Sequence, residues 1–171
     1  MRIFYFLIFL CILFFLNFFL FKKGPYDSKP HDLSRSEICA NDSMIIVNYN
    51  GPKAQIVWKD SKRSFYCEVR EAFYDSLDRV RGKQVLAFYV QDFSNIEWGS
   101  YVDKWILASD AFYVIDSNKD GAMGLTYVPF SNYEFANIFF NLYGGKIVKF
   151  SDIDTNVLSI SSNLLKNRAI N

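Results

Sequence analysis

Three sulfur-bearing side chains form the pattern with the most chemical content in this sequence. Cys39 is followed five residues later by Met44, and Met123 lies in the glycine-flanked stretch Asp120-Gly121-Ala122-Met123-Gly124. Thiolate and thioether sulfurs are soft ligands, which select Cu(I) over Ca²⁺, Mg²⁺ or Mn²⁺. We therefore expect a Cu(I) site formed by Cys39, Met44 and Met123, on the hypothesis that the fold brings the Met123 loop to the other two residues.

Both methionines also have an ordinary structural interpretation. Met44 begins the apolar run Met44-Ile45-Ile46-Val47, where a methionine commonly fills a core. Met123 becomes a core residue if its loop folds over the neighbouring strands, and it is an exposed sulfur if the loop does not. The spacing leaves both interpretations open for each residue.

Cys67 is a further candidate, because it stands where a predicted strand meets a predicted helix. A helix N-terminus lowers the pKa of a thiol, so Cys67 is a fourth ligand, a reactive thiol or a small buried residue. Cys39 and Cys67, the two cysteines outside the N-terminal apolar run, either form a disulfide or stay free, since sequence does not determine their pairing.

Other kinds of metal site find little support in the sequence. His31, in a polar stretch, is the only histidine, which argues against a histidine-based zinc or Cu(II) site. Asp116, Asn118 and Asp120 imitate the start of a calcium loop. Tyr127, however, occupies the twelfth position, where an EF-hand requires a bidentate glutamate. We expect this segment to be a hairpin turn.

The motifs of the common enzyme classes are missing from the sequence. It contains no G-x-S-x-G, no glycine-rich phosphate loop and no histidine near a nucleophile. Asp92, a single carboxylate after a predicted strand, is interpreted as structural. Nineteen Lys and Arg residues stand against eighteen Asp and Glu, so the formal charge is +1 and no basic face is implied. We therefore expect neither an enzyme nor a nucleic-acid-binding protein.

The N-terminus carries a candidate membrane segment. Ile3 to Phe21 is apolar except for Asn17, and as a helix it would be about 28 Å long, close to the hydrocarbon thickness of a bilayer. Leu10 precedes Cys11 where a lipobox would have a small residue. We expect residues 1–23 to form an uncleaved signal anchor with a transmembrane helix. The alternative is a cleaved signal peptide, which leaves the same domain without its tether.

The remaining chain predicts an α+β fold with an internal repeat. Residues 24–37, rich in polar residues, are a predicted linker. The order strand, turn, strand, helix, glycine, strand occurs in residues 54–93 and again in 111–152. We expect two small ββαβ lobes within residues 38–153, lobe one at about 44–93 and lobe two at about 105–153. Each lobe would bury too little apolar area alone, so the two are expected to pack together.

Individual elements follow from the local pattern. Strands are expected over 44–49, 54–58, 64–66, 84–90, 111–115, 125–130 and 146–150, and a first helix over 68–80. Ser131, with Glu134 three residues later, forms a predicted capping box for a second helix. Its apolar stripe is Phe135, Ile138, Phe139 and Leu142. Residues 154–171 are expected to be a polar, weakly helical tail.

Together these pieces resemble the NosL family, over Cys39 to about Ile153. No single piece is specific for the family, but the order of the pieces and their separation along the chain are. The matching pieces are Cys39…Met44, Gly51-Pro52-Lys53-Ala54-Gln55-Ile56, Phe65-Tyr66-Cys67, Tyr89-Val90-Gln91-Asp92-Phe93, Trp105, Ala111-Phe112-Tyr113-Val114, Met123-Gly124, Pro129-Phe130 and Gly144-Gly145.

The resemblance implies a membrane-tethered Cu(I) chaperone on the periplasmic face of the inner membrane, anchored through residues 3–21. Its partners would be nitrous oxide reductase, whose copper centres it would help to mature, or the membrane maturation complex of that enzyme. The resemblance carries the ligand roles to Cys39, Met44 and Met123. The sequence departs from the common family pattern Cys-x2-Cys-Gly-Met, because Asp42 and Ser43 replace the second cysteine and the glycine. A carboxylate is a poor Cu(I) ligand.

One alternative belongs to a different functional class. The chain would then be a membrane-anchored protein-interaction module with a structural Cys39–Cys67 disulfide and no metal.

Overall fold

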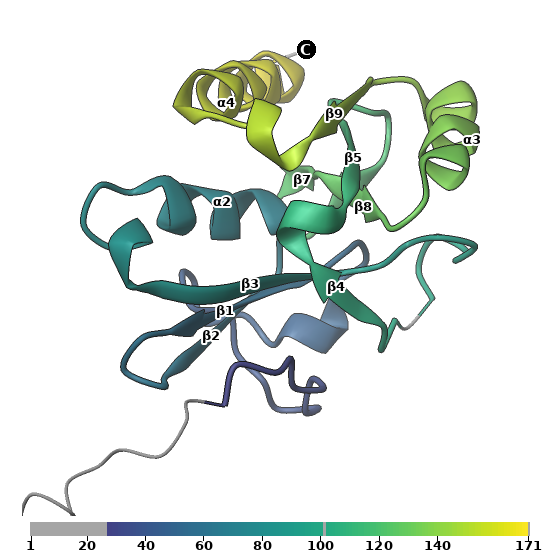
Figure 1. Ribbon diagram of the computed structural model, residues 1–171. Helices are drawn as coiled ribbons and strands as arrows, with labels where there is room; N and C mark the ends of the chain where they lie inside the picture. The colour runs from purple at the N-terminus through teal and green to yellow at the C-terminus, as the bar shows by residue number, and fades with distance from the viewer. Residues whose placement is uncertain (1–26, 101, 171) are drawn as a thin grey trace, which may run out of the picture.

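Two antiparallel sheets, each accompanied by a helix, make up most of this computed structural model, which describes residues 27–100 and 102–170 (Figure 1). The first sheet has the strand order β2-β1-β3-β4 and the second has the order β8-β5-β9. The mixed α+β class expected from the sequence is confirmed.

The first lobe runs from the first strand pair through a helix to a third strand. β1 (Ala54–Trp58) pairs with β2 (Arg63–Tyr66) and with β3 (Val85–Gln91), and β3 also pairs with β4 (Trp105–Leu107). Helix α2 (Val69–Leu77) connects β2 to the 3₁₀ turn η2 (Gly82–Gln84) and then to β3. It covers one face of the sheet (Figure 1).

The second lobe repeats this order with an inserted hairpin. β5 (Phe112–Ile115) follows the 3₁₀ turn η3 (Ala108–Asp110) and pairs with β8 (Val128–Phe130) and β9 (Lys146–Lys149), and α3 (Tyr133–Tyr143) connects the last two strands. The short strands β6 (Asp120–Gly121) and β7 (Gly124–Leu125) form the hairpin between β5 and β8. Strand β5 therefore corresponds to β1, β8 to β2, and β9 to β3, which is the predicted ββαβ order in both lobes.

The two lobes share one hydrophobic core, in which Phe73 of α2 is central. Its ring centroid lies 5.2 Å from that of Phe88 in lobe one, and 5.4 and 6.0 Å from those of Tyr113 and Tyr127 in lobe two. The ring centroid of Phe150, which follows β9, lies 5.2 Å from that of Phe73. Val69, Ala72 and Phe73 are fully buried at helical spacing, so α2 presents its apolar stripe to both lobes at once.

Asp92, at the end of β3, provides a polar connection between the lobes. Its carboxylate accepts hydrogen bonds from Ser131 N and Oγ at 2.9 and 2.6 Å and from Ser94 N at 3.0 Å. Lys104 Nζ lies 2.7 Å from Asp92 Oδ2. Next to it, Phe93 N donates to Pro129 O across the lobes at 2.9 Å. The structural role expected for Asp92 is confirmed.

One predicted strand is absent. Residues 44–49 make only an isolated bridge between Ile38 and Ile45, followed by the 3₁₀ turn η1 (Ile46–Asn48), so the strand prediction over 44–49 was wrong. The chain is held by Cys39 N donating to Met44 O and by Ile46 N donating to Glu37 O. These bonds close a loop whose only deeply buried aliphatic residue is Ile46, and they override the β-branched composition.

The boundaries of other elements also differ from the prediction. The single strand expected over 125–130 is split into β7 and β8, and Pro129 lies on the edge strand β8, where a missing N–H is tolerated. The N-cap of α3 is Asn132, whose side chain accepts from Glu134 N at 2.7 Å, whereas the Ser131 hydroxyl is bound to Asp92. The predicted capping residue is thus displaced by one position.

Both flanking segments are attached to the folded core. In the predicted linker, His31 N donates to Gln55 Oε1 and Gln55 Nε2 donates to His31 O, each at 2.9 Å, and Tyr89 OH donates to Ser28 O at 2.8 Å. After the 3₁₀ turn η4 (Phe150–Asp152), the segment expected to be a polar tail forms α4 (Thr155–Ile170), which lies beside α2 and places Leu158 in the shared core (Figure 1).

The expected anchor, residues 1–23, lies outside the described residues. Within 27–100 and 102–170, none of the helices combines the length and the apolar character that a membrane span requires.

The Asp92 connection gives a stability prediction. Burial by itself would raise the pKa of this carboxyl, but the bonds from Lys104, Ser131 and Ser94 hold it well below its usual value. Its stabilising effect is therefore complete above the unfolded pKa of about 4 and is lost as the pH falls through the lower folded value. We expect Asp92→Asn to lower the free energy of unfolding by about 2 kcal/mol at pH 7, as for hydrogen bonds to charged groups.

Urea unfolding of both proteins at several pH values measures this difference, which should be constant from pH 7 to pH 5 and shrink in more acidic solution. Asp110→Asn is the control for a carboxylate exposed on the surface. A difference that grows on acidification would contradict the assignment.

Candidate metal centre

Four side chains able to bind a metal converge where the Cys39 loop meets the start of α2. They are Cys39, Asp42, Cys67 and Glu71, and one ligand atom from each lies within 4.8 Å of all the others. In the described part of the chain this is the one group of three or more cysteine, histidine, aspartate or glutamate residues arranged in this way. Sequence positions separated by up to 32 residues are thus brought to one point.

The Cys39–Met44 loop folds back on itself and so presents its side chains on one side. Cys39 N donates to Met44 O at 2.9 Å, and Ser43 N donates to Cys39 O at 3.1 Å. Asp42 Oδ1 accepts from Met44 N at 2.9 Å, which fixes this carboxylate over the loop. Ser43 has φ +61°, a left-handed conformation that a glycine would adopt more easily.

The other half of the cluster comes from the end of β2 and the first turn of α2. Ala40 N donates to Phe65 O at 2.8 Å, which places the loop on β2. Cys67 N then donates to Cys39 Sγ at 3.4 Å. Glu71, four residues after Cys67, places Oε2 at 3.4 Å from Cys39 Sγ and 3.6 Å from Cys67 Sγ.

The electrostatics of the cluster favour a bound cation. A hydrogen bond from Cys67 lowers the pKa of the Cys39 thiol, even though burial opposes ionisation. The same contact, burial and the nearby Glu71 carboxylate raise the pKa of Cys67, and burial raises the pKa of Glu71. Two thiols and two carboxylates this close repel one another when they ionise, so a bound cation would stabilise their ionised forms.

Two further charged groups lie buried behind the cluster. Lys53 donates from Nζ to Cys67 O at 3.2 Å and to Asn50 O at 3.1 Å, and burial lowers its pKa. Glu68 is completely buried, and burial raises its pKa to about 7. Its Oε1 accepts from Met123 N at 2.9 Å.

The two predicted methionine ligands lie beside the cluster in different ways. Met44 packs, half buried, against the hydrophobic group that contains Cys39, Ile46, Phe65 and Cys67. Met123 is at the tip of the β6–β7 hairpin and is 47% exposed, so its loop does not bury it in a core. Its neighbour Ala122 packs against the same group, which brings the hairpin to the cysteines.

The structure also shows which site residues the sequence prediction missed. Cys39 and Cys67 are both buried and both free thiols. Glu71 was not considered, although the spacing Cys67-x3-Glu71 at a predicted helix start places both side chains on one helix face. Asp42 was noted only as a replacement for a cysteine. Its position beside Cys67 Sγ, with Oδ2 at 3.8 Å, depends on the loop closure that the sequence did not reveal.

The calcium-like segment connects β5 to β6 and is not the hairpin turn that was expected, because β6 pairs with β7 and the turn lies at Ala122 and Met123. It leads into the hairpin strand β6, and Asp116 adopts φ +56° and accepts a hydrogen bond on Oδ1 from Ser161 Oγ at 2.7 Å.

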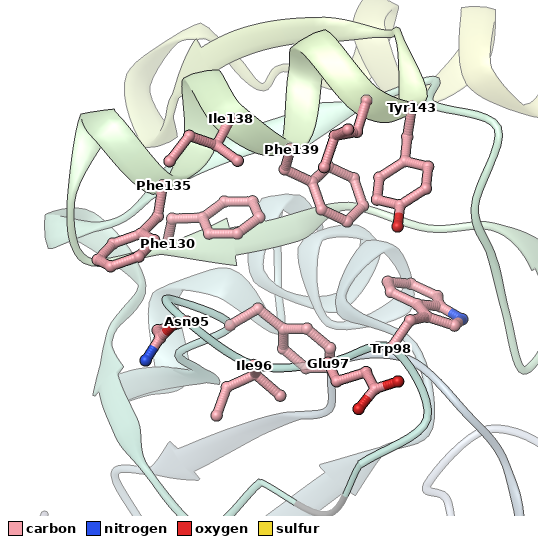
Figure 2. A pocket seen from close by; sticks show the side chains of 11 residues that line it. Asn95, Ile96, Glu97, Trp98, Phe130, Phe135, Ile138, Phe139 and Tyr143 are labelled. Atoms are coloured by element: carbon pink, nitrogen blue, oxygen red, sulfur yellow. The ribbon is translucent and has the colours of Figure 1, made fainter.

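A separate apolar groove lies between α3 and the loop that follows β3 (Figure 2). Its volume is about 430 Å³, and side chains of the two elements face each other across it, including Trp98 and Phe139. Ile138 and Leu142, predicted as part of the apolar stripe of α3, line this groove and are 48% and 67% exposed. None of the residues lining the groove carries a sulfur or an imidazole, so it is not part of the metal centre.

Comparison with known proteins places this geometry in a family. The NosL family model matches residues 30–158. The copper-binding lipoprotein NosL of Stutzerimonas stutzeri is 27% identical over 135 residues, covering 78% of this chain and 69% of the relative. The protein of the same name from Achromobacter cycloclastes is 32% identical over 129 residues, covering 72% and 67%.

A solved structure agrees with the sequence matches. The crystal structure of the copper chaperone NosL from Shewanella denitrificans superimposes with a TM-score of 0.72 at 30% identity, covering 78% of this chain and 99% of that one. The matched residues span the Cys39 loop, both lobes and the start of α4. The chain belongs to the NosL family.

Proposed function

We propose that this protein binds Cu(I) at the cluster around Cys39 and acts as a copper chaperone. The observation that carries the proposal is the meeting of the two thiols at one point, with Met44 and the Met123 neighbour Ala122 packed against the same group. The family supports it, since relatives that span nearly all of the folded part are named as copper-binding proteins and a copper chaperone.

The sulfur atoms make Cu(I) the best match for the site. We assign Cys39, Met44 and Met123 as ligands, with Cys67 Sγ close enough to contribute. The lowered pKa of Cys39 favours the thiolate, which is the form that binds a metal. Asp42 and Glu71 are poor Cu(I) ligands, and their role in the proposal is to add negative charge beside the ion.

Low-coordinate binding by sulfur is suited to transfer rather than to catalysis. An incoming sulfur ligand can attack a two- or three-coordinate Cu(I) ion before the first ligand leaves. Met123 is the exposed member of the set, whereas Cys39 and Cys67 are buried, so exchange would begin at the hairpin. We propose that the acceptor is nitrous oxide reductase or its membrane maturation complex and that the protein is not an enzyme.

We further propose that residues 3–21 hold the domain at the periplasmic face of the inner membrane. The support is the length of this segment, which is apolar except for Asn17, and the description of two relatives as lipoproteins, which are also membrane-associated.

The first prediction concerns Met123. We expect Met123→Ala to weaken Cu(I) binding by at least about tenfold, because a soft ligand is removed from the ion. The measurement is an anaerobic competition titration of the full chain in detergent against a chromophoric Cu(I) chelator. Val80→Ala, which truncates another exposed apolar side chain, is the control and should bind as the wild type does. An unchanged affinity in Met123→Ala would remove this residue from the ligand set.

The second prediction separates the chaperone from an interaction module held by a disulfide. In a Cys11→Ser background, protein unfolded without reductant should show two reactive thiols, Cys39 and Cys67, and the native protein should bind one equivalent of Cu(I). Cys39→Ser in this background should lose that equivalent. No reactive thiols and no bound copper would favour the module.

The third prediction concerns copper delivery and its dependence on the membrane anchor. In a nitrous-oxide-reducing host lacking its own copy of this gene, the full chain should restore the copper content of purified nitrous oxide reductase. Replacing residues 1–23 by a cleavable signal peptide should leave Cu(I) binding unchanged and restore less than about half of that copper, because a tether raises the effective concentration of the domain at the membrane. Equal restoration by both forms would rule out a required anchor.

A further inference from the structure

Glu68 is a buried carboxylate that connects the two parts of the candidate copper site. It directly follows Cys67 and precedes α2, and its side chain has no exposed surface. Its Oε1 accepts a hydrogen bond from Met123 N at 2.9 Å, 55 residues further along the chain. One side chain of lobe one therefore fixes the tip of the hairpin that belongs to lobe two.

The hairpin is shaped to admit this carboxylate. A Cβ atom added to Gly121 would lie 2.3 Å from Glu68 Oε1, which is closer than real Cβ contacts. The same Cβ would lie 3.0 Å from Glu68 Cδ and from Thr126 Cβ, both tighter than most such contacts, so the Glu68 side chain would have to shift. Glycine at position 121 thus lets the carboxylate pass under the hairpin and reach Met123 N.

Burying a charged side chain is costly unless it is paired and hydrogen-bonded. Lys53 and Arg70 both act on Glu68 with favourable charge, and Lys53 Nζ itself donates to Cys67 O. Among the described residues, Glu68 Oε2 is buried without a hydrogen-bond partner. The hydrogen bond from Met123 N to Oε1 therefore joins the hairpin to the residue that follows Cys67.

We propose that Glu68 is a positioning residue that holds the Met123 hairpin beside Cys39 and Cys67 and so makes the Met123 thioether available to the metal. This inference rests on the proposed Cu(I) function and adds a residue that does not itself touch the ion. Outer groups that orient ligands typically change metal affinity by about 10- to 100-fold when they are removed.

The test is a double-mutant cycle on the full chain in detergent, with Cu(I) affinity measured by chelator competition. Glu68→Ala should weaken binding by about tenfold in the wild-type background and by less than about twofold in the Met123→Ala background. Glu68→Gln keeps an oxygen acceptor for Met123 N and should recover most of the lost affinity. Glu97→Ala, a carboxylate in the separate apolar groove, is the matched control.

A second variant and a spectroscopic signal distinguish loss of hairpin positioning from loss of the folded structure. Gly121→Ala leaves the carboxylate in the chain but displaces it from the hairpin, so it should reproduce the Met123-dependent loss. The ¹³C resonance of the Met123 ε-methyl group should shift on Cu(I) addition in wild type and Glu68→Gln. It should shift less in Glu68→Ala and Gly121→Ala.

The outcomes separate this inference from the proposed function. An equal loss from Glu68→Ala in both backgrounds, or no loss in either, would overturn the positioning role while leaving Met123 as a ligand. If Met123→Ala by itself has no effect, both the ligand assignment and the positioning role are overturned.

Discussion

The packing of α2 against both lobes is the constraint on which the rest of the structure depends. One core cluster takes its buried residues from both lobes, and a second lies between α3 and its sheet. Phe73 connects the lobes in the first cluster by contacting aromatic rings from both, which fixes α2 between them. Because Cys67 and Glu68 lie immediately before this helix and Glu71 lies in its first turn, the shared core also fixes half of the metal centre.

The candidate metal centre combines a rigid half with an exposed half. Cys39, Cys67 and Glu71 are held by β2, α2 and a closed loop, and their mutual repulsion on ionisation is relieved by protons or by a cation. Met123 is one of the two residues at the tip of a hairpin that approaches the cluster from the other lobe. Under the proposed function, the buried sulfurs would retain the ion while Met123 stays exposed to a partner.

Much of the architecture could be predicted from periodicity. Alternating and helical spacing in residues 54–93 and 111–152 indicated the ββαβ repeat. Each strand or helix buries one face, and the spacing of its apolar residues shows which face that is. The strand over 44–49 could not be rejected in this way, since Ile45, Ile46 and Val47 have a strong strand composition. Its conformation is determined by the bonds of Cys39 and Ile46 to distant parts of the loop.

The site was only partly accessible to such reasoning. Soft-ligand chemistry predicted Cys39, Met44 and Met123 as ligands, which stays a prediction, and the hairpin does approach the cysteines. Glu71 and Glu68 were missed because their importance comes from contacts across 32 and 55 residues, which no local pattern reports. The exposure of Ile138 and Leu142 was missed for the related reason that helical spacing shows a stripe but not what covers it.

The attachment of the N-terminal segment to the first sheet fixes where the folded unit begins. Tyr89 OH donates to Ser28 O, and His31 and Gln55 bind each other twice, so the folded unit begins by residue 28. With the proposed anchor ending at Phe21, six residues would connect the two parts, and a chain of that length spans at most about 20 Å. Under that proposal, an acceptor of the metal would meet the site close to the lipid headgroups.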